Sequence, residues 1–99
     1  MDSHPTLILL KEVRTFVERA RATGDDRDFA TAVDMALAAS TTSNADFAEE
    51  VHASEPTVAR WREGRSTPVP TIRPAIFAAL DARIAGVIEA FEAFHTPKP

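Results

Sequence analysis

Arginine is the residue type whose placement most clearly predicts chemistry in this 99-residue chain. Arg60, Arg62, Arg65 and Arg73 stand close together with a single acidic residue among them, Glu63, so this segment carries +3 although the whole chain carries −4. Guanidinium groups neutralise phosphates and can bond a guanine edge through two donors. An acidic chain with one basic segment is expected to bind polyanions through a single face, and not non-specifically over its whole surface. The alternative is that these arginines form an ordinary solvated helix face.

Other reactive side chains form no catalytic or metal-binding pattern. The acidic pairs at 25–26 and 49–50 have no plausible nucleophile or glycine-rich phosphate loop to act with. The three histidines, His4, His52 and His95, lack the spacing of metal ligands. No cysteine is present, so neither a disulfide nor a thiolate site can form. We therefore expect a binding protein, not an enzyme, with no cofactor and no metal.

Helical periodicity runs through most of the sequence and predicts an all-α fold of about five helices in one domain spanning residues 1–99. Asp26 is expected to cap the second helix, Ser43 the third and Ser54 the fourth, while Gly64 ends the fourth in a left-handed conformation. Pro68 and Pro70 predict a loop over residues 65–71. The other predicted helices cover residues 6–22, 26–39, 44–51 and 74–94, and residues 95–99 are expected to fray.

Two short helices in the middle of the chain are separated by only a tight turn at His52 and Ala53, which predicts a helix-turn-helix over residues 44–64. Such a pair suits DNA, because the first helix braces a second one that is short enough to enter a groove about 12 Å wide. We read Trp61 as core and not as a base-stacking platform, because its helical position matches that of Val58. The expected inward-facing residues are Phe47, Ala48, Val51, Ala53, Val58 and Trp61.

The stretch from Asn44 to about Leu80 resembles the helix-turn-helix family of lambda repressor and Cro, often called the XRE family. The fourth helix ends in the pattern Arg-Trp-x-x-Gly, followed by a basic residue and a proline. Two departures stand out: His52 replaces the usual turn glycine and must accept a left-handed conformation, and Asn44 replaces a longer glutamine that touches a phosphate. The matching residues are Asp46-Phe47-Ala48-Glu49-Glu50-Val51, Ser54-Glu55-Pro56-Thr57-Val58-Ala59-Arg60-Trp61-Arg62-Glu63-Gly64, Arg65 and Pro68.

This resemblance implies which residues meet DNA. Arg60 would bond guanine and Glu55 could accept from cytosine, each discriminating by about 1 to 3 kcal/mol; Glu55 could equally be a partner of the helix dipole. Arg62 and Arg65 would position the protein on the duplex without reading sequence. The implied base-contacting residues are Glu55, Pro56, Thr57, Ala59 and Arg60, and the implied phosphate-contacting residues are Asn44, Arg62, Arg65 and Ser66.

A homodimer is expected, because proteins of this kind read two half-sites about 34 Å apart. The apolar stripe of the last helix is the predicted interface, with residues 7–10 as a second contributor. The alternative is that the two terminal helices pack on each other within one subunit. The predicted interface residues are Ile84, Ile88, Phe91 and Phe94.

The most direct functional expectation is a sequence-specific regulator of transcription that binds double-stranded DNA in the cytoplasm and associates with the nucleoid. The alternative is a protein-interaction module, such as an antitoxin-like or adaptor protein, whose acidic surface binds a basic partner. The longest apolar run, residues 7–10, is far short of the roughly 20 residues that span a bilayer, so no membrane is expected.

Overall fold

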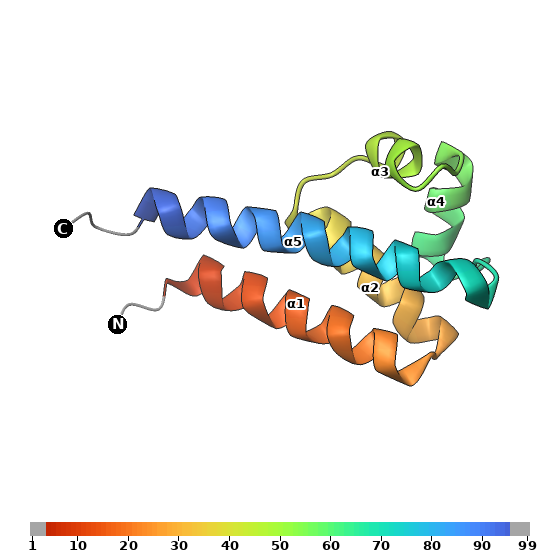
Figure 1. Ribbon diagram of the computed structural model, residues 1–99, viewed down its shortest axis with the longest axis horizontal. Coiled ribbons are helices and arrows are strands. Elements are labelled where there is room, and N and C mark those ends of the chain that lie inside the picture. The colour runs from red at the N-terminus through yellow and green to blue at the C-terminus, as the bar shows by residue number, and fades with distance from the viewer. Residues whose placement is uncertain (1–3, 96–99) are drawn as a thin grey trace.

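The computed structural model describes residues 4–95, which fold into an elongated helical molecule measuring 47 × 26 × 20 Å (Figure 1). The predicted all-α class with about five helices is confirmed over this range. A frayed tail was expected over residues 95–99, but His95 is the last residue of α5, and residues 96–99 lie outside the described residues. The elements in order are α1 Pro5–Thr23, α2 Asp26–Ala39, α3 Asn44–Glu50, α4 Glu55–Glu63, a 3-10 turn η1 Pro70–Ile72 and α5 Arg73–His95.

The first two helices are joined by a short turn at Gly24. Gly24 ends α1 with φ 68°, a left-handed conformation that glycine adopts without steric cost. The side chain of Asp25 then caps α2 by accepting from the backbone N–H groups of Arg27 and Asp28. The predicted cap, Asp26, is therefore wrong by one residue. Asp26 is instead the first residue of the helix, where its negative charge favours the helix dipole.

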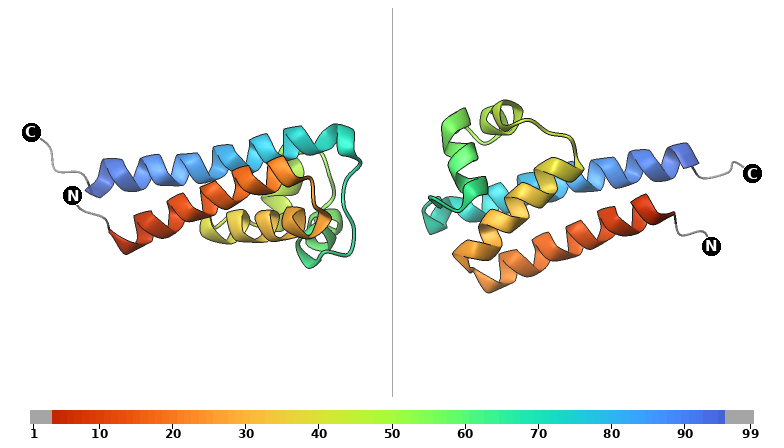
Figure 2. Two further views of the ribbon diagram at one scale, coloured as in Figure 1. Left: turned by 90° about the horizontal axis from the view of Figure 1, so that it is seen from below. Right: turned by 180° about the vertical axis from the view of Figure 1, so that it is seen from behind.

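The terminal helices α1 and α5 lie antiparallel, so both ends of the described chain lie at the same end of the molecule (Figures 1 and 2). This is the most extensive helix-to-helix contact in the fold. Ile84 and Ile88 of α5 are buried in the chain's own core at 0% and 6% exposure. Their predicted role in a dimer interface is therefore wrong, because α1 already covers them. Phe91 is half-buried and Phe94 is 84% exposed.

Ion pairs run along the seam between α1 and α5. Arg14 donates from Nε to Asp81 at 2.9 Å and from Nη2 to the second oxygen of the same carboxylate at 3.2 Å. The hydrogen bond and the charge of Asp81 raise the pKa of the Arg14 guanidinium. Lys11, three residues before Arg14, pairs with Glu92 of α5 at 3.4 Å. The alternative prediction, that the terminal helices pack on each other within one subunit, is the arrangement observed.

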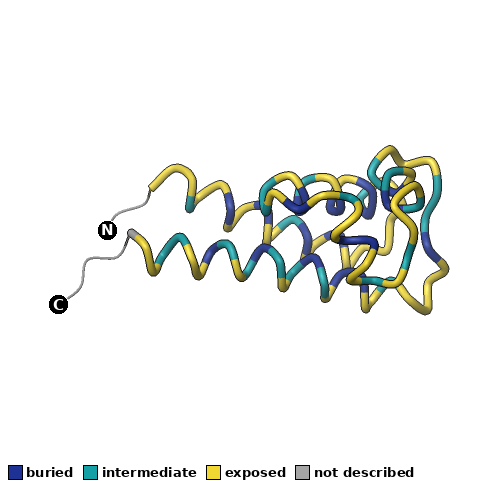
Figure 3. Tube along the Cα trace, turned by 90° about the horizontal axis from the view of Figure 1, so that it is seen from above, coloured by how far each residue is buried: buried dark blue, intermediate teal, exposed yellow. Residues whose placement is uncertain are grey.

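A cluster of aromatic rings joins the helix-turn-helix to the rest of the core. Phe29 of α2 meets Trp61 of α4 edge to face at 5.9 Å and Phe77 of α5 at 5.6 Å. Each such contact stabilises the fold by about 0.5 to 1.5 kcal/mol beyond the contribution from burying the rings. Buried positions gather where α2, α4 and α5 meet, whereas the free ends of α1 and α5 are mostly exposed (Figure 3). Trp61 thus anchors α4 to α2, and Phe29 joins α2 to α5.

The segment between α4 and α5 is held by one arginine. Arg73 donates to the carbonyl of Pro68 at 3.2 Å and to Asp26 of α2 at 2.8 Å. The predicted loop over 65–71 is largely confirmed, but Pro70 to Ile72 form a short 3-10 turn, and α5 begins at Arg73, one residue before the expected Pro74. No helix in the described range is long and apolar enough to cross a membrane.

Candidate nucleic-acid interface

Each of the two short helices starts from a serine cap, as its sequence predicts. Ser43 Oγ accepts from the backbone N–H of Asp46 at 3.0 Å, and Ser54 Oγ accepts from that of Thr57 at 3.2 Å. A cap of this kind stabilises a helix by about 1 kcal/mol, which matters most for helices of only seven and nine residues. The Ser54 cap therefore fixes where α4 begins.

The turn between α3 and α4 contains a residue in the left-handed region. His52 has φ 59°, as its place at a usual glycine position predicts. The backbone N–H of Ala53 then donates to the carbonyl of Ala48 at 2.8 Å and closes the turn. Ala48 is 3% exposed and small where the two helices come together.

The inner face of α4 is apolar and its end is closed by glycine. Val58 is completely buried and Trp61 is 4% exposed, so Trp61 is core, as expected. Gly64 ends the helix with φ 74°, and a Cβ there would lie 3.8 Å from the Cβ of Ala30, an ordinary contact. Glycine is therefore favoured at this position by the backbone conformation and not by lack of space.

The outer face of α4 carries the residues that would face a DNA groove. Glu55, Pro56 and Arg60 are exposed, whereas Thr57 and Ala59 are half-buried. The Thr57 hydroxyl lies 2.7 Å from the Ser54 hydroxyl and accepts from Arg60 Nη2 at 3.4 Å. Thr57 thus contributes to the cap and positions Arg60, while Arg60 itself reaches into solvent.

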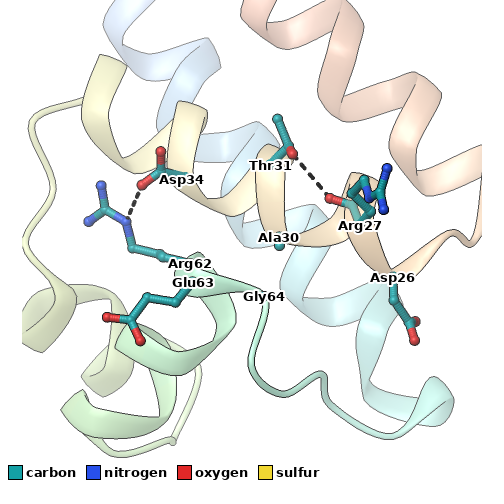
Figure 4. A pocket seen from close by; sticks show the side chains of 8 residues that line it. All are labelled: Asp26, Arg27, Ala30, Thr31, Asp34, Arg62, Glu63 and Gly64. Carbon is teal, nitrogen blue, oxygen red and sulfur yellow. Dashed lines mark hydrogen bonds and ion pairs between the residues drawn. The ribbon is translucent and has the colours of Figure 1, made fainter.

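Arg62 ties α4 to the two helices beside it. Its Nε donates to Asp34 of α2 at 2.8 Å, and its Nη1 donates to Oδ1 of Asn44 in α3 at 2.8 Å. Figure 4 shows Arg62 extended toward Asp34 across an open pocket between α2 and the end of α4. Two of the predicted phosphate-contacting residues, Arg62 and Asn44, therefore lie together and hydrogen-bond each other.

Arg65 and Arg73 of the basic segment also pair with acidic residues. Arg65 pairs with Glu63 at 3.3 Å on the surface, and Arg73 pairs with Asp26 of α2 at 2.8 Å. Ser66 is half-buried beside them. Within residues 4–95, Arg60 is the one arginine of the segment that pairs with no carboxylate.

Asp34 is the residue of this region that sequence reasoning missed. It lies in α2, 28 residues from Arg62, and nothing in the local pattern of α2 marks it as different from other exposed acidic residues. Among the described residues, no group of three or more histidine, cysteine or acidic side chains is arranged to hold a metal ion.

The chain matches no protein-family model, no curated protein and no solved structure. Inferences about function therefore depend on the geometry of α3 and α4 and on the charges around them.

Proposed function

We propose that this protein binds double-stranded DNA with α4 in the major groove and regulates transcription, as the resemblance to the XRE family implies. One observation carries the proposal: Arg60 extends from the outer face of a short, capped and braced helix with no carboxylate partner within residues 4–95. A guanidinium in that position can form two hydrogen bonds with guanine. In this proposal the chain is a binding protein and not an enzyme, and it acts in the cytoplasm as a homodimer.

The ion pairs of Arg62 and Arg65 are compatible with DNA binding. Both members of the Arg65–Glu63 pair are more than half exposed, and exposed pairs contribute only about 0 to 1 kcal/mol. A phosphate oxygen can therefore replace Glu63 as the partner of Arg65 at little cost. Arg62 is different because its side chain is only 23% exposed and bonds two residues at once. Arg62 accordingly serves to position α4, and Arg65 is the better candidate for a phosphate contact.

The test is fluorescence anisotropy with duplexes selected from a random pool, measured at low and near-physiological salt. Arg60→Ala and Arg65→Ala are matched variants because each removes one positive charge from an exposed side chain. Arg60→Ala should lose about 1 to 3 kcal/mol of discrimination at one base pair. Arg65→Ala should weaken binding to all duplexes alike. It should also reduce the slope of log affinity against log salt concentration by about 1. Absence of duplex binding by the wild type at low salt would rule out the proposal.

A second candidate function, an antitoxin-like or adaptor protein that binds a basic partner, is favoured by the acidic residues around α4. Asp34, Glu55 and Glu63 all lie on or beside this helix, and Asp34 and Glu63 are more than half exposed. Pull-down with the Arg60→Ala variant separates the two candidates. A partner that is retained by this variant, together with no duplex binding by the wild type, would support the second candidate.

A further inference from the structure

Helix α1 presents a line of side chains to solvent on the flank that it turns toward α2. Figure 2 shows α1 between α5 on one side and α2 on the other. Leu9, Glu12, Phe16 and Arg19 recur at the spacing that places residues along one line of a helix. Together with Met35 of α2 they line an open groove, and we call these five residues the α1 stripe.

The apolar members of the α1 stripe are incompletely covered by the chain itself. Leu9 is 60% exposed, and Ile8 beside it is 45% exposed. Phe16 and Met35 pack against the core by one side and remain half-exposed on the other. Contiguous apolar surface with a polar rim is typical of a protein interface.

The charged members of the α1 stripe have no partner within residues 4–95. Glu12 and Arg19 take part in no ion pair, whereas Lys11 and Arg14 of the same helix pair with α5. Glu12 and Arg19 lie two helical turns apart, about 10.5 Å along the axis, which is too far for a pair between them. Their nearest neighbours along the stripe, Leu9 and Phe16, are uncharged.

The order of these residues along α1 makes the stripe complementary to itself. If a second α1 lies antiparallel across a two-fold axis that passes beside Phe16, each Glu12 faces the Arg19 of the other copy. A two-fold interface must be self-complementary, and opposite charges on either side of a central aromatic residue meet that condition.

We propose that a second copy of this chain docks on the α1 stripe, with the two α1 helices antiparallel and two symmetric pairs between Glu12 and Arg19. The stripe replaces the α5 surface as the dimer interface, since Ile84 and Ile88 are covered within one subunit. This inference rests on the homodimer of the proposed function and names its interface, but it does not rest on DNA binding, because its residues belong to α1 and α2 and not to α3 and α4. A dimer without DNA binding, or DNA binding by a monomer, would separate the two proposals.

Sedimentation equilibrium of the full chain, with charge reversals on the stripe, tests the proposal. The wild type should dimerise at micromolar concentrations. Glu12→Arg and Arg19→Glu each place like charges opposite each other at two symmetric points, so each should weaken dimerisation by about tenfold or more. The double variant exchanges the two charges and should restore dimerisation, because opposite charges face each other again.

Arg21→Glu is the matched control, because it makes the same charge change as Arg19→Glu on an exposed residue of the other flank of α1. It should leave dimerisation unchanged, and circular dichroism should show that every variant keeps its helices. A wild type that stays monomeric at hundreds of micromolar would overturn the proposal. So would single reversals that dimerise normally, or a double variant that remains monomeric although both single variants fold.

Discussion

The Nε of Arg62 in α4 donates to Oδ1 of Asp34 in α2 at 2.8 Å, and this bond joins the helix proposed to enter DNA to the helix that supports it. The same guanidinium donates to Asn44 at the start of α3 at 2.8 Å. One side chain therefore holds α2, α3 and α4 in a fixed relation. Variants of Arg62 can therefore show whether it stabilises the fold or contacts DNA.

Arg62→Ala should lower the free energy of unfolding by about 1 to 3 kcal/mol, because both acceptors lose a charged donor. Arg62→Lys keeps the positive charge but cannot bond both residues with the geometry of a guanidinium. It should recover little of the stability while keeping the general attraction to DNA. Urea denaturation and duplex anisotropy measure the two effects. A lysine variant as stable as the wild type would contradict a positioning role for Arg62.

Glu63→Gln should strengthen binding to all duplexes alike, because it removes a negative charge beside the proposed DNA face and releases Arg65. The pair between these residues is exposed, so the free energy of unfolding should change by less than about 1 kcal/mol. Duplex anisotropy over a salt series would show a higher affinity at low salt. Glu89→Gln, an exposed change of the same kind on α5, is the control and should leave affinity unchanged. Equal affinities of wild type and Glu63→Gln for duplexes would indicate that the surface around Glu63 and Arg65 does not contact DNA.

The sequence predicts the helices and their ends well where the signal is local. Ser43, Ser54 and Gly64 act as predicted because caps depend on residues within one turn. The predicted cap of α2, Asp26, is wrong by one residue because two aspartates are adjacent and Asp25 is the cap. Nothing in the sequence predicts the positive φ of 52° at Thr41, since β-branched residues rarely adopt it.

Tertiary relations are the part that the sequence does not predict. The apolar stripe of α5 exceeds what a small core needs, but only the packing of α1 against it shows that Ile84 and Ile88 are covered. The charge of the basic segment can be counted, but its pairing with Asp34 and Asp26 depends on α2 folding back beside it. The candidate site is therefore predictable as a set of residues, whereas the partners that those residues hold are not.

His52→Gly should raise the free energy of unfolding by about 0.5 to 1 kcal/mol. The left-handed conformation at φ 59° costs an L-residue with a Cβ about 1 to 2 kcal/mol, and the gain is reduced by the greater backbone entropy of unfolded glycine. His52 is exposed, so few contacts are lost. His52→Ala keeps the Cβ and should show no gain. If alanine stabilised the protein as much as glycine, backbone strain at this turn would not be the cause.

Ser54→Ala should lower the free energy of unfolding by about 1 kcal/mol and should weaken DNA binding beyond that loss. Ser54 Oγ holds the first turn of α4 through the N–H and hydroxyl of Thr57, and the Thr57 hydroxyl in turn bonds Arg60. Losing the cap therefore loosens the helix start and the side chain proposed to read guanine. Ser54→Asp, which still caps, should keep most of the stability, and Ser43→Ala is the control because it removes the equivalent cap of α3. Thermal denaturation measures the loss of stability, and anisotropy with a selected duplex measures the loss of base discrimination. If Ser43→Ala and Ser54→Ala reduced base discrimination equally, the chain of bonds from Ser54 to Arg60 would have no special part in recognition.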